Sequence, residues 1–268
     1  MTQTFPPNKD FLGYQQNSFA IDGSDGYGRV RTVSPHVLFC SSLDLSDDAF
    51  LFNSSTATGG TGTYNSTKKR YDLSVTTSSG SQSLRESRVR GYLQPGRTCL
   101  AIQTALFASG QTNTDQRVGV FTDNNGAFWV LSGTTLKVVT RNKVSGSVVD
   151  TSVSQASFNL DTLDGNGPSK ITVDLTKIQQ WVVEWSHMSA GLVRFGIIVQ
   201  GRILWAHYVD QNNVGSEVFM QSGTLPLRCE IINTGVGAGA KTLVMGNGVI
   251  LSDGQPSFFG KNFGINLG

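Results

Sequence analysis

Strict alternation of apolar and polar residues in short segments is the feature that most constrains this fold. Near residue 180, one such segment places Trp181, Val183 and Trp185 on the same side. The segments 193–199 and 203–208 alternate in the same way, and short Gly-containing turns separate all three. A period of two residues is that of a β-strand with one buried face. We therefore predict three antiparallel strands between residues 181 and 208, with Trp181, Trp185 and Phe195 mostly buried.

Similar segments recur at short intervals along the rest of the chain, at 100–106, 117–121, 128–131 and 136–140. Asn125-Gly126 between two of them is typical of a hairpin with a type I′ turn. The composition agrees, because 31 glycines and only 15% charged residues suit many turns and few helices. No segment has the pattern of an amphipathic helix of three turns. The predicted fold class is all-β, an antiparallel β-sandwich of the jelly-roll-like kind.

Two parts of the chain differ in composition and in the density of strand patterns. Residues 1–84 contain Pro6-Pro7 and long Ser/Thr/Gly/Asn tracts at 53–67 and 74–84, whereas dense strand patterns start near Arg85. We expect residues 1–84 to be an extended N-terminal arm with a loop-rich segment, and residues 85–268 to be the sandwich domain. A segment of this composition orders on assembly, so we expect it to contribute disproportionately to contacts between chains.

Net charge and cysteine content limit the kinds of partner and site that the chain can have. A net charge of +2 gives no broad reason for nucleic-acid or membrane-surface binding. Cys40, Cys99 and Cys229 are too few and too widely spaced for a disulfide framework or a zinc site. The first residues lack the pattern of a signal peptide, and no apolar run approaches a membrane-spanning length. The two glycosylation sequons, at Asn53 and Asn65, are interpreted as chance matches.

Motifs for catalysis and metal binding are weak. The histidines are His36, His187 and His207, and no G-x-S-x-G elbow accompanies them. Asp22-Gly-Ser-Asp25 begins like a calcium loop, but its twelfth position is Val33 instead of glutamate. We expect structural histidines, an ordinary turn at Asp22, no metal and no cofactor.

A Gly-rich segment, 235–242, is one substitution away from a phosphate-binding P-loop. Such a loop works only when a helix follows it, because the helix N-terminus supplies the N–H groups and the dipole. Residues 243–251 have a strand pattern, so we expect a plain loop between two strands.

Carboxylates and tryptophans leave two possibilities open. Glu184, Asp210 and Glu230 are the acidic residues near the aromatic block, and a glycosidase needs two carboxyl groups about 5–10 Å apart. The simpler interpretation of Glu184 is a cross-strand ion pair with Arg194. A tryptophan platform could bind carbohydrate, but a sandwich core is the favoured place for the aromatic side chains. These are Trp129, Trp181, Trp185, Phe195 and Trp205.

Between residues 85 and 233 the sequence resembles a group of virion proteins of tailed phages and large DNA viruses. The matching pieces lie in one order over more than half of the chain, and no piece alone is specific. They include Arg88-Val-Arg-Gly-Tyr-Leu-Gln-Pro95-Gly96, Arg117-Val-Gly-Val-Phe121, Asn159-Leu-Asp-Thr-Leu-Asp-Gly-Asn-Gly-Pro168, Val193-Arg-Phe-Gly196 and Leu225-Pro-Leu-Arg228-Cys-Glu-Ile231. The resemblance implies a β-sandwich capsid-associated, vertex, fibre or tail component.

From these observations we expect a viral structural protein of the virion, assembled in the host cell, with no catalytic residues and no enzymatic activity. Its partners would be copies of itself and other virion proteins, with a host surface glycan as a further partner. The candidate interface or ion-pair residues are Arg88, Arg117, Glu184, Arg194, Arg228 and Glu230. Two alternatives remain, a glycan- or receptor-binding fibre module and a virion-borne polysaccharide hydrolase.

Overall fold

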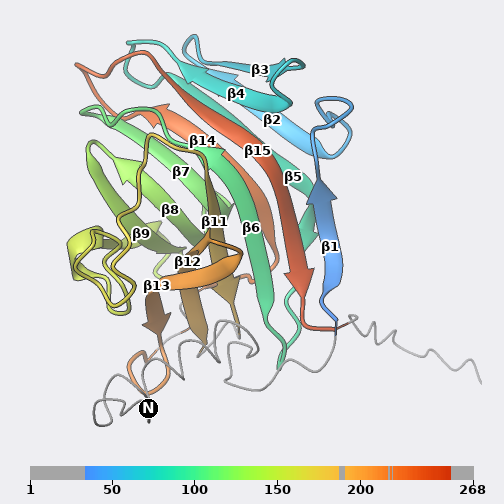
Figure 1. The fold of residues 1–268 in the computed structure, drawn as a ribbon, viewed down its shortest axis with the longest axis vertical. Helices are drawn as coiled ribbons and strands as arrows, with labels where there is room; N and C mark the ends of the chain where they lie inside the picture. Colours follow the sequence, from blue (N-terminus) through green and yellow to red (C-terminus); the bar gives the residue numbers. More distant parts are fainter. Residues whose placement is uncertain (1–33, 187–190, 217, 219, 255–268) are drawn as a thin grey trace, which may run out of the picture.

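The computed structural model describes residues 34–186, 191–216, 218 and 220–254. Two antiparallel sheets pack face to face (Figure 1), and the only helical element among the described residues is one 3-10 turn, η1 (Gln155–Ser157). The predicted all-β sandwich is therefore confirmed. No helix in the described ranges has the length and apolar character needed to cross a membrane.

The first sheet has eight strands. Along its main path the order is β13 (Arg202–Asp210), β12 (Leu192–Val199), β11 (Gln179–Trp185), β6 (Cys99–Leu106), β15 (Lys241–Ser252), β4 (Arg70–Val75) and β3 (Thr61–Asn65). The eighth strand, β1 (His36–Ser41), pairs with the far end of β15. One long strand, β15, thus holds β6 on one side and both β4 and β1 on the other.

The second sheet has seven strands. Their order is β10 (Val149–Ser154), β9 (Thr135–Asn142), β8 (Gly126–Ser132), β7 (Thr114–Phe121), β14 (Leu225–Asn233), β5 (Gln82–Gly91) and β2 (Phe52–Ala57). The central strands β7 and β14 are far apart in sequence and pair antiparallel. This pairing joins distant parts of the chain within one sheet.

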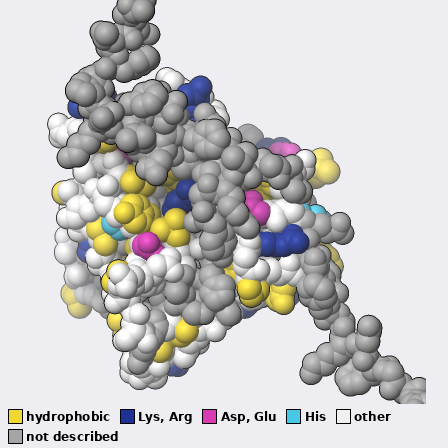
Figure 2. All heavy atoms as spheres, turned by 90° about the horizontal axis from the view of Figure 1, so that it is seen from below, with side chains coloured by type: hydrophobic (Ala, Val, Ile, Leu, Met, Phe, Trp, Pro, Cys, Tyr) yellow, Lys and Arg dark blue, Asp and Glu magenta, His cyan; other side chains and the backbone are white. Residues whose placement is uncertain are grey.

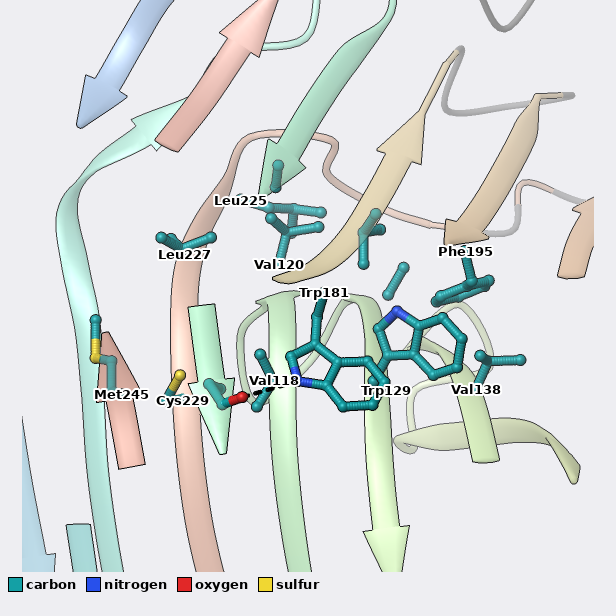
Figure 3. Close-up of a cluster of buried hydrophobic side chains, with 14 of the residues drawn as sticks. Val118, Val120, Trp129, Val138, Trp181, Phe195, Leu225, Leu227, Cys229 and Met245 are labelled. Atoms are coloured by element: carbon teal, nitrogen blue, oxygen red, sulfur yellow. Dashed lines mark hydrogen bonds between the residues drawn. The ribbon is translucent and has the colours of Figure 1, made fainter. Parts of the chain in front are cut away.

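Alternation along each strand sends one set of side chains into the space between the sheets. Trp129 from β8 lies against Trp181 from β11, with ring centroids 5.1 Å apart, and Phe195 stands edge-on to Trp129 (Figure 3). The indole N–H of Trp129 donates to the carbonyl of Val182 across the two sheets, at 3.1 Å. The buried indole ring of Trp129 thus fills the core, and its N–H also forms a hydrogen bond that links the two sheets.

Strands β11, β12 and β13 form the antiparallel meander that the alternation between residues 181 and 208 predicts. A β-bulge at the Phe195–Gly196 step leaves Ala206 without a partner of its own, because Phe195 pairs with His207 and Gly196 with Trp205. The bulge turns Trp205 to the outer face of the sheet, while His207 lies beside Phe158 of the core. The expectation that Trp205 belongs to the core between the sheets is therefore wrong, although the side chain is buried. The extra residue in β13 is the reason.

The β7–β8 turn differs from the type I′ turn expected at Asn125-Gly126. Thr122 and Asn125 close a four-residue loop through a backbone hydrogen bond of 2.7 Å, and Gly126 is the first residue of β8. Gly126 has φ +144°, and a side chain there would overlap the backbone of Phe121. The glycine is required by this close approach of the two strands and not by the turn type.

The expected boundary between residues 84 and 85 is not a boundary of the described fold. Strand β5 runs across it, and residues 36–75 contribute β1 to β4 to the two sheets. The Ser/Thr-rich tract looked loop-like because it forms edge strands: five of the six residues of β2 are exposed and need no apolar side chains. Residues 1–33 of the predicted arm lie outside the described residues.

Candidate functional site

A row of charged side chains crosses the outer face of the seven-stranded sheet. Cys229 and Ile231 of β14 point into the core, so their neighbours Arg228 and Glu230 point outward. The same alternation turns Glu86 of β5, and Asp115 and Arg117 of β7, to this outer face. We call Glu86, Arg228, Glu230, Arg117 and Asp115 the charge row.

Strand register brings opposite charges together. Arg228 pairs across the sheet with Glu86, and Glu230 pairs with Arg117. Arg117 lies 3.1 Å from Glu230 and 2.8 Å from Asp115, so one guanidinium holds two carboxylates. Arg228 lies 3.2 Å from Glu230 and 3.5 Å from Glu86. Acid and base thus alternate over three neighbouring strands.

The middle of the row is buried and its ends are partly open. Glu230 is 2% exposed and accepts hydrogen bonds from Arg117, Arg228 and the amide of Gln82. Asp115 is 19% exposed. Burial by itself would lower the pKa of Arg117, but the charges of Glu230 and Asp115 outweigh it and raise the pKa above its ordinary value. The row is therefore an array of paired acidic and basic side chains, which can hydrogen-bond hydroxyl groups of a ligand at its open ends.

Two phenylalanines lie beside the row on the same face. Phe121 and Phe128 have ring centroids 4.5 Å apart, and the guanidinium of Arg228 lies 4.9 Å from the Phe121 ring. On the other side, Arg141 lies 5.1 Å from Phe128 and forms two hydrogen bonds with Asp150, at 2.7 and 2.8 Å. Cation–π contacts and ion pairs together hold the arginine side chains flat over the aromatic rings.

The remaining candidate ion-pair residues lie elsewhere. Glu184 and Arg194 form the cross-strand ion pair that their spacing predicts, on the outer face of the eight-stranded sheet. The guanidinium of Arg194 also lies 4.5 Å from the Trp205 ring. Arg88 is exposed and donates to the carbonyl of Phe52. Of the six predicted residues, the structure brings Arg117, Arg228 and Glu230 together.

The three carboxylates considered for glycoside hydrolysis do not share a cleft. Glu230 lies on the outer face of the seven-stranded sheet, whereas Glu184 lies on the outer face of the other sheet. Asp210 ends β13, an edge strand of the eight-stranded sheet. The sandwich separates them because β11 and β14 belong to different sheets. The carboxylates that share an arginine with Glu230 are Asp115, Glu86 and Asp123, which sequence reasoning missed.

The tryptophans do not form an exposed carbohydrate-binding platform on the described surface, because all four are buried. His36 lies in β1, His207 is buried and accepts a hydrogen bond from the backbone N–H of Asn159, and His187 lies outside the described residues. The Gly-rich segment 235–242 leads directly into β15, so the structure places a strand where a P-loop needs a helix. The calcium-like turn at Asp22 also falls outside the described residues.

Groups suited to metal binding are not found in the described part of the chain, where no cluster of three or more His, Cys, Asp or Glu side chains could hold an ion. Cys40, Cys99 and Cys229 are free thiols. Burial raises the pKa of Cys99 to about 12, so this thiol is kept protonated and unreactive.

In the face drawn in Figure 2, basic and acidic side chains are interspersed among hydrophobic and uncharged ones.

No protein-family model and no curated protein matches the sequence. Solved structures do match the fold. A glycosyl hydrolase family 16 protein from Mycobacterium smegmatis superposes with a TM-score of 0.51 at 13% identity, covering 80% of this chain and 100% of its own. A glycoside hydrolase family protein from Mycobacterium thermorestibile matches with a TM-score of 0.51 at 11% identity, over 80% and 100% of the two chains. A pseudo β-1,3-glucanase and immunostimulatory antigen of Mycobacterium tuberculosis reaches 0.53 at 14% identity, over 80% and 98%.

These likenesses show the fold, and they correct one expectation. The prediction that the chain is not an enzyme is wrong on this comparison, because two of the three structures that share its sandwich are named as glycosyl hydrolases. The third is named a pseudo-enzyme, so the same fold carries both kinds of protein. None of the three is named as a virion protein.

Proposed function

We propose that the protein binds a polysaccharide of the β-glucan type across the outer face of its seven-stranded sheet. The charge row is the observation that carries this proposal, because its partly open ends offer the carboxylates of Glu86 and Asp115 and the guanidinium of Arg117 on β5 and β7. Sugar hydroxyls donate to carboxylates and accept from guanidinium groups, and the latter can bind two oxygens at once. The glucanase-like fold supports the choice of ligand class.

A second candidate function, glycoside hydrolysis, is favoured by the pair of carboxylates that share Arg117. Asp115 lies one strand across and two residues along from Glu230, which places their Cα atoms about 8 Å apart. Inverting hydrolysis needs one carboxylic acid to protonate the leaving oxygen and one carboxylate to take a proton from the attacking water. Glu230 and Asp115 are the residues that would carry these two roles.

Laminarin, a β-1,3-glucan, is the probe that tests both functions. We expect laminarin in a native gel to retard the full-length protein, and Asp115→Asn to weaken the binding about three- to tenfold. Asp72→Asn is the matched control: Asp72 is 21% exposed and paired with Arg70, but it lies on the other sheet. Equal retardation of the wild type and Asp115→Asn, or none of either, would contradict the proposal.

Release of reducing ends from the same glucan separates hydrolysis from binding. Hydrolysis predicts release that is lost in both Asp115→Asn and Glu230→Gln, while Asp72→Asn keeps it. Because Glu230 is buried between two arginines, its variant must first be shown to fold, and Asp115→Asn carries the test if it does not. Binding without release would reject the second candidate and leave the first intact.

Location on a virus particle is a separate proposal, supported by the sequence resemblance alone. A virion component of this kind would present its glycan-binding face to a host surface or to the polysaccharide around the host. Mass spectrometry of purified particles from an infected culture tests it: the protein should copurify with the capsid proteins at constant ratio through a density gradient. Its absence from the particles would overturn the location without touching the glycan-binding proposal.

A further inference from the structure

The opposite face of the sandwich carries a hollow that the proposed function does not use. It has a volume of about 460 Å³ and lies on the outer face of the eight-stranded sheet. Its lining comes from β6, β11 and β15, with β1 and the loop 42–51 as one wall. Figure 1 shows β1, β15 and β6 side by side there. A volume of this size is within the range of small-molecule sites.

A local irregularity in β15 lies beside this hollow. The pairing of β15 with β6 shifts between Met245 and Gly248, so that Gly246 and Asn247 form a bulge. Asn247 is exposed as a result and reaches the rim of the hollow. Beneath it, Ile102 and Val249 make an apolar floor. The bulge interrupts the β15–β6 pairing beside the hollow.

The opposite wall, the loop 42–51, is held in place from below. Asp48 accepts a hydrogen bond from the hydroxyl of Ser41 at 2.6 Å, and Tyr64 donates to the carbonyl of Leu43 at 2.7 Å. The buried guanidinium of Arg85 donates to the carbonyl of Asp47 and lies against the rings of Phe52 and Tyr71. A wall fixed in this way costs little ordering entropy when a ligand binds.

The lining selects one kind of ligand. Among the described residues that line it, Asp48 is the only one with a charged side chain, so the hollow repels anions. Its other polar groups include the side chains of Thr104, Gln180 and Asn247, and within the described part of the chain no hydrogen bond joins the two amides to protein groups. An ionised carboxylate has roughly four acceptor sites. Asp48 uses three of them, toward Ser41, Leu43 and Ser46, and one is left for a ligand.

We propose that this hollow binds a single neutral sugar residue. A pyranose ring has an apolar C–H face, which matches Ile102 and Val249, and a rim of hydroxyl groups, which matches the amides and the carboxylate. The site would be distinct from the charge row, because the two lie on opposite outer faces of the sandwich. It gives the protein a second point of contact with a branched or cell-attached glycan, and two weak sites on one molecule raise overall affinity.

Ligand-detected NMR on the intact protein tests this site with glucose, galactose and mannose, and with sialic acid as the anionic comparison. At least one neutral sugar should bind and sialic acid should not. Gln180→Ala and Asn247→Ala should each weaken binding about three- to tenfold, and Val249→Phe, which fills the floor, should abolish it. Gln179→Ala is the matched control, because its side chain leaves the same strand on the other face.

Each outcome decides something about one of the two sites. Retention of monosaccharide binding by Asp115→Asn supports a separate site in the hollow, even if laminarin binding is lost. Loss of monosaccharide binding in Asp115→Asn but not in Gln180→Ala would overturn the hollow as a site and leave the charge row standing. Absence of binding for all three neutral sugars, or preference for sialic acid, would also overturn it.

Discussion

At the scale of single residues, buried side chains with one polar atom explain how this core is specified. Trp129 and Trp181 both donate their indole N–H to a backbone carbonyl of the eight-stranded sheet. The indole N–H of Trp205 is buried with no hydrogen-bond partner among the described groups. Trp129 and Trp205 thus bury the same side chain, but only Trp129 has a hydrogen-bond partner for its indole N–H. The free-energy cost of replacing them should therefore differ.

We predict that Trp129→Phe lowers the free energy of unfolding by about 1–3 kcal/mol, because it removes both ring volume and the hydrogen bond that joins the sheets. Trp205→Phe should cost less, since no hydrogen bond is lost and an unpaired buried N–H disappears. Urea denaturation followed by far-UV circular dichroism measures both values. A larger loss for the Trp205 variant would show that the bond across the sheets contributes little.

His207 predicts a pH dependence of stability. Burial lowers the pKa of His207 below its ordinary value of 6.5, so the unfolded chain binds this proton more tightly than the folded protein does. The stability contributed by the neutral side chain is present above about pH 6.5 and is lost as the pH falls through the lower, folded pKa. His207→Asn keeps an acceptor for the N–H of Asn159 but does not titrate. Between pH 7.5 and 5, the melting temperature should fall more steeply for the wild type than for the variant; parallel curves would count against this account.

At the scale of elements, irregular strands place the functional groups. The bulge in β13 decides which side of the sheet Trp205 and His207 occupy, and the bulge in β15 lies beside the hollow. Gly248 follows the second bulge, and a Cβ atom there would overlap the side chain of Leu227 from the other sheet. The two sheets therefore approach each other closely at Gly248.

Gly248→Ala should consequently destabilise the fold by about 1–3 kcal/mol, because Leu227 must move within a packed core. Gly133→Asn is the control: Gly133 has φ +60°, which asparagine tolerates, and nothing lies within 4 Å of its would-be side chain. Thermal unfolding by calorimetry gives both values. If Gly248→Ala melts with the wild type, the close approach of the sheets at this point is not a packing constraint.

Sequence reasoning recovered the elements better than their irregularities. Alternation found β11, β12 and β13, because each has one face in the core and a period of two survives in the sequence. It misjudged β2, in which five of the six residues are exposed, and it missed the bulges in β13 and β15, which shift register without leaving a distinct pattern. Of the charge row, it named Arg117, Arg228 and Glu230 but could not place them together. Asp115 and Glu86 were missed, since only strand pairing shows that they face Glu230's arginines.

At the scale of the whole molecule, the sandwich presents two outer faces with different chemistry. The seven-stranded sheet carries fixed charges on adjacent strands, and the eight-stranded sheet carries a hollow with a polar rim and an apolar floor. Under the two proposals above, the first face would bind an extended glycan chain and the second a single sugar residue. The prediction that residues 1–84 contribute most contacts between chains stays a prediction for an assembled particle.

Hydrogen–deuterium exchange of the intact protein, with and without a β-1,3-glucan hexasaccharide, tests the central claim most directly. We expect slower exchange in peptides from β5, β7 and β14, which carry the charge row, and less protection of the same peptides in Asp115→Asn. Peptides from β4, around Asp72, should exchange at the same rate in both samples. Unchanged exchange throughout, or protection confined to strands of the eight-stranded sheet, would contradict glycan binding by the charge row.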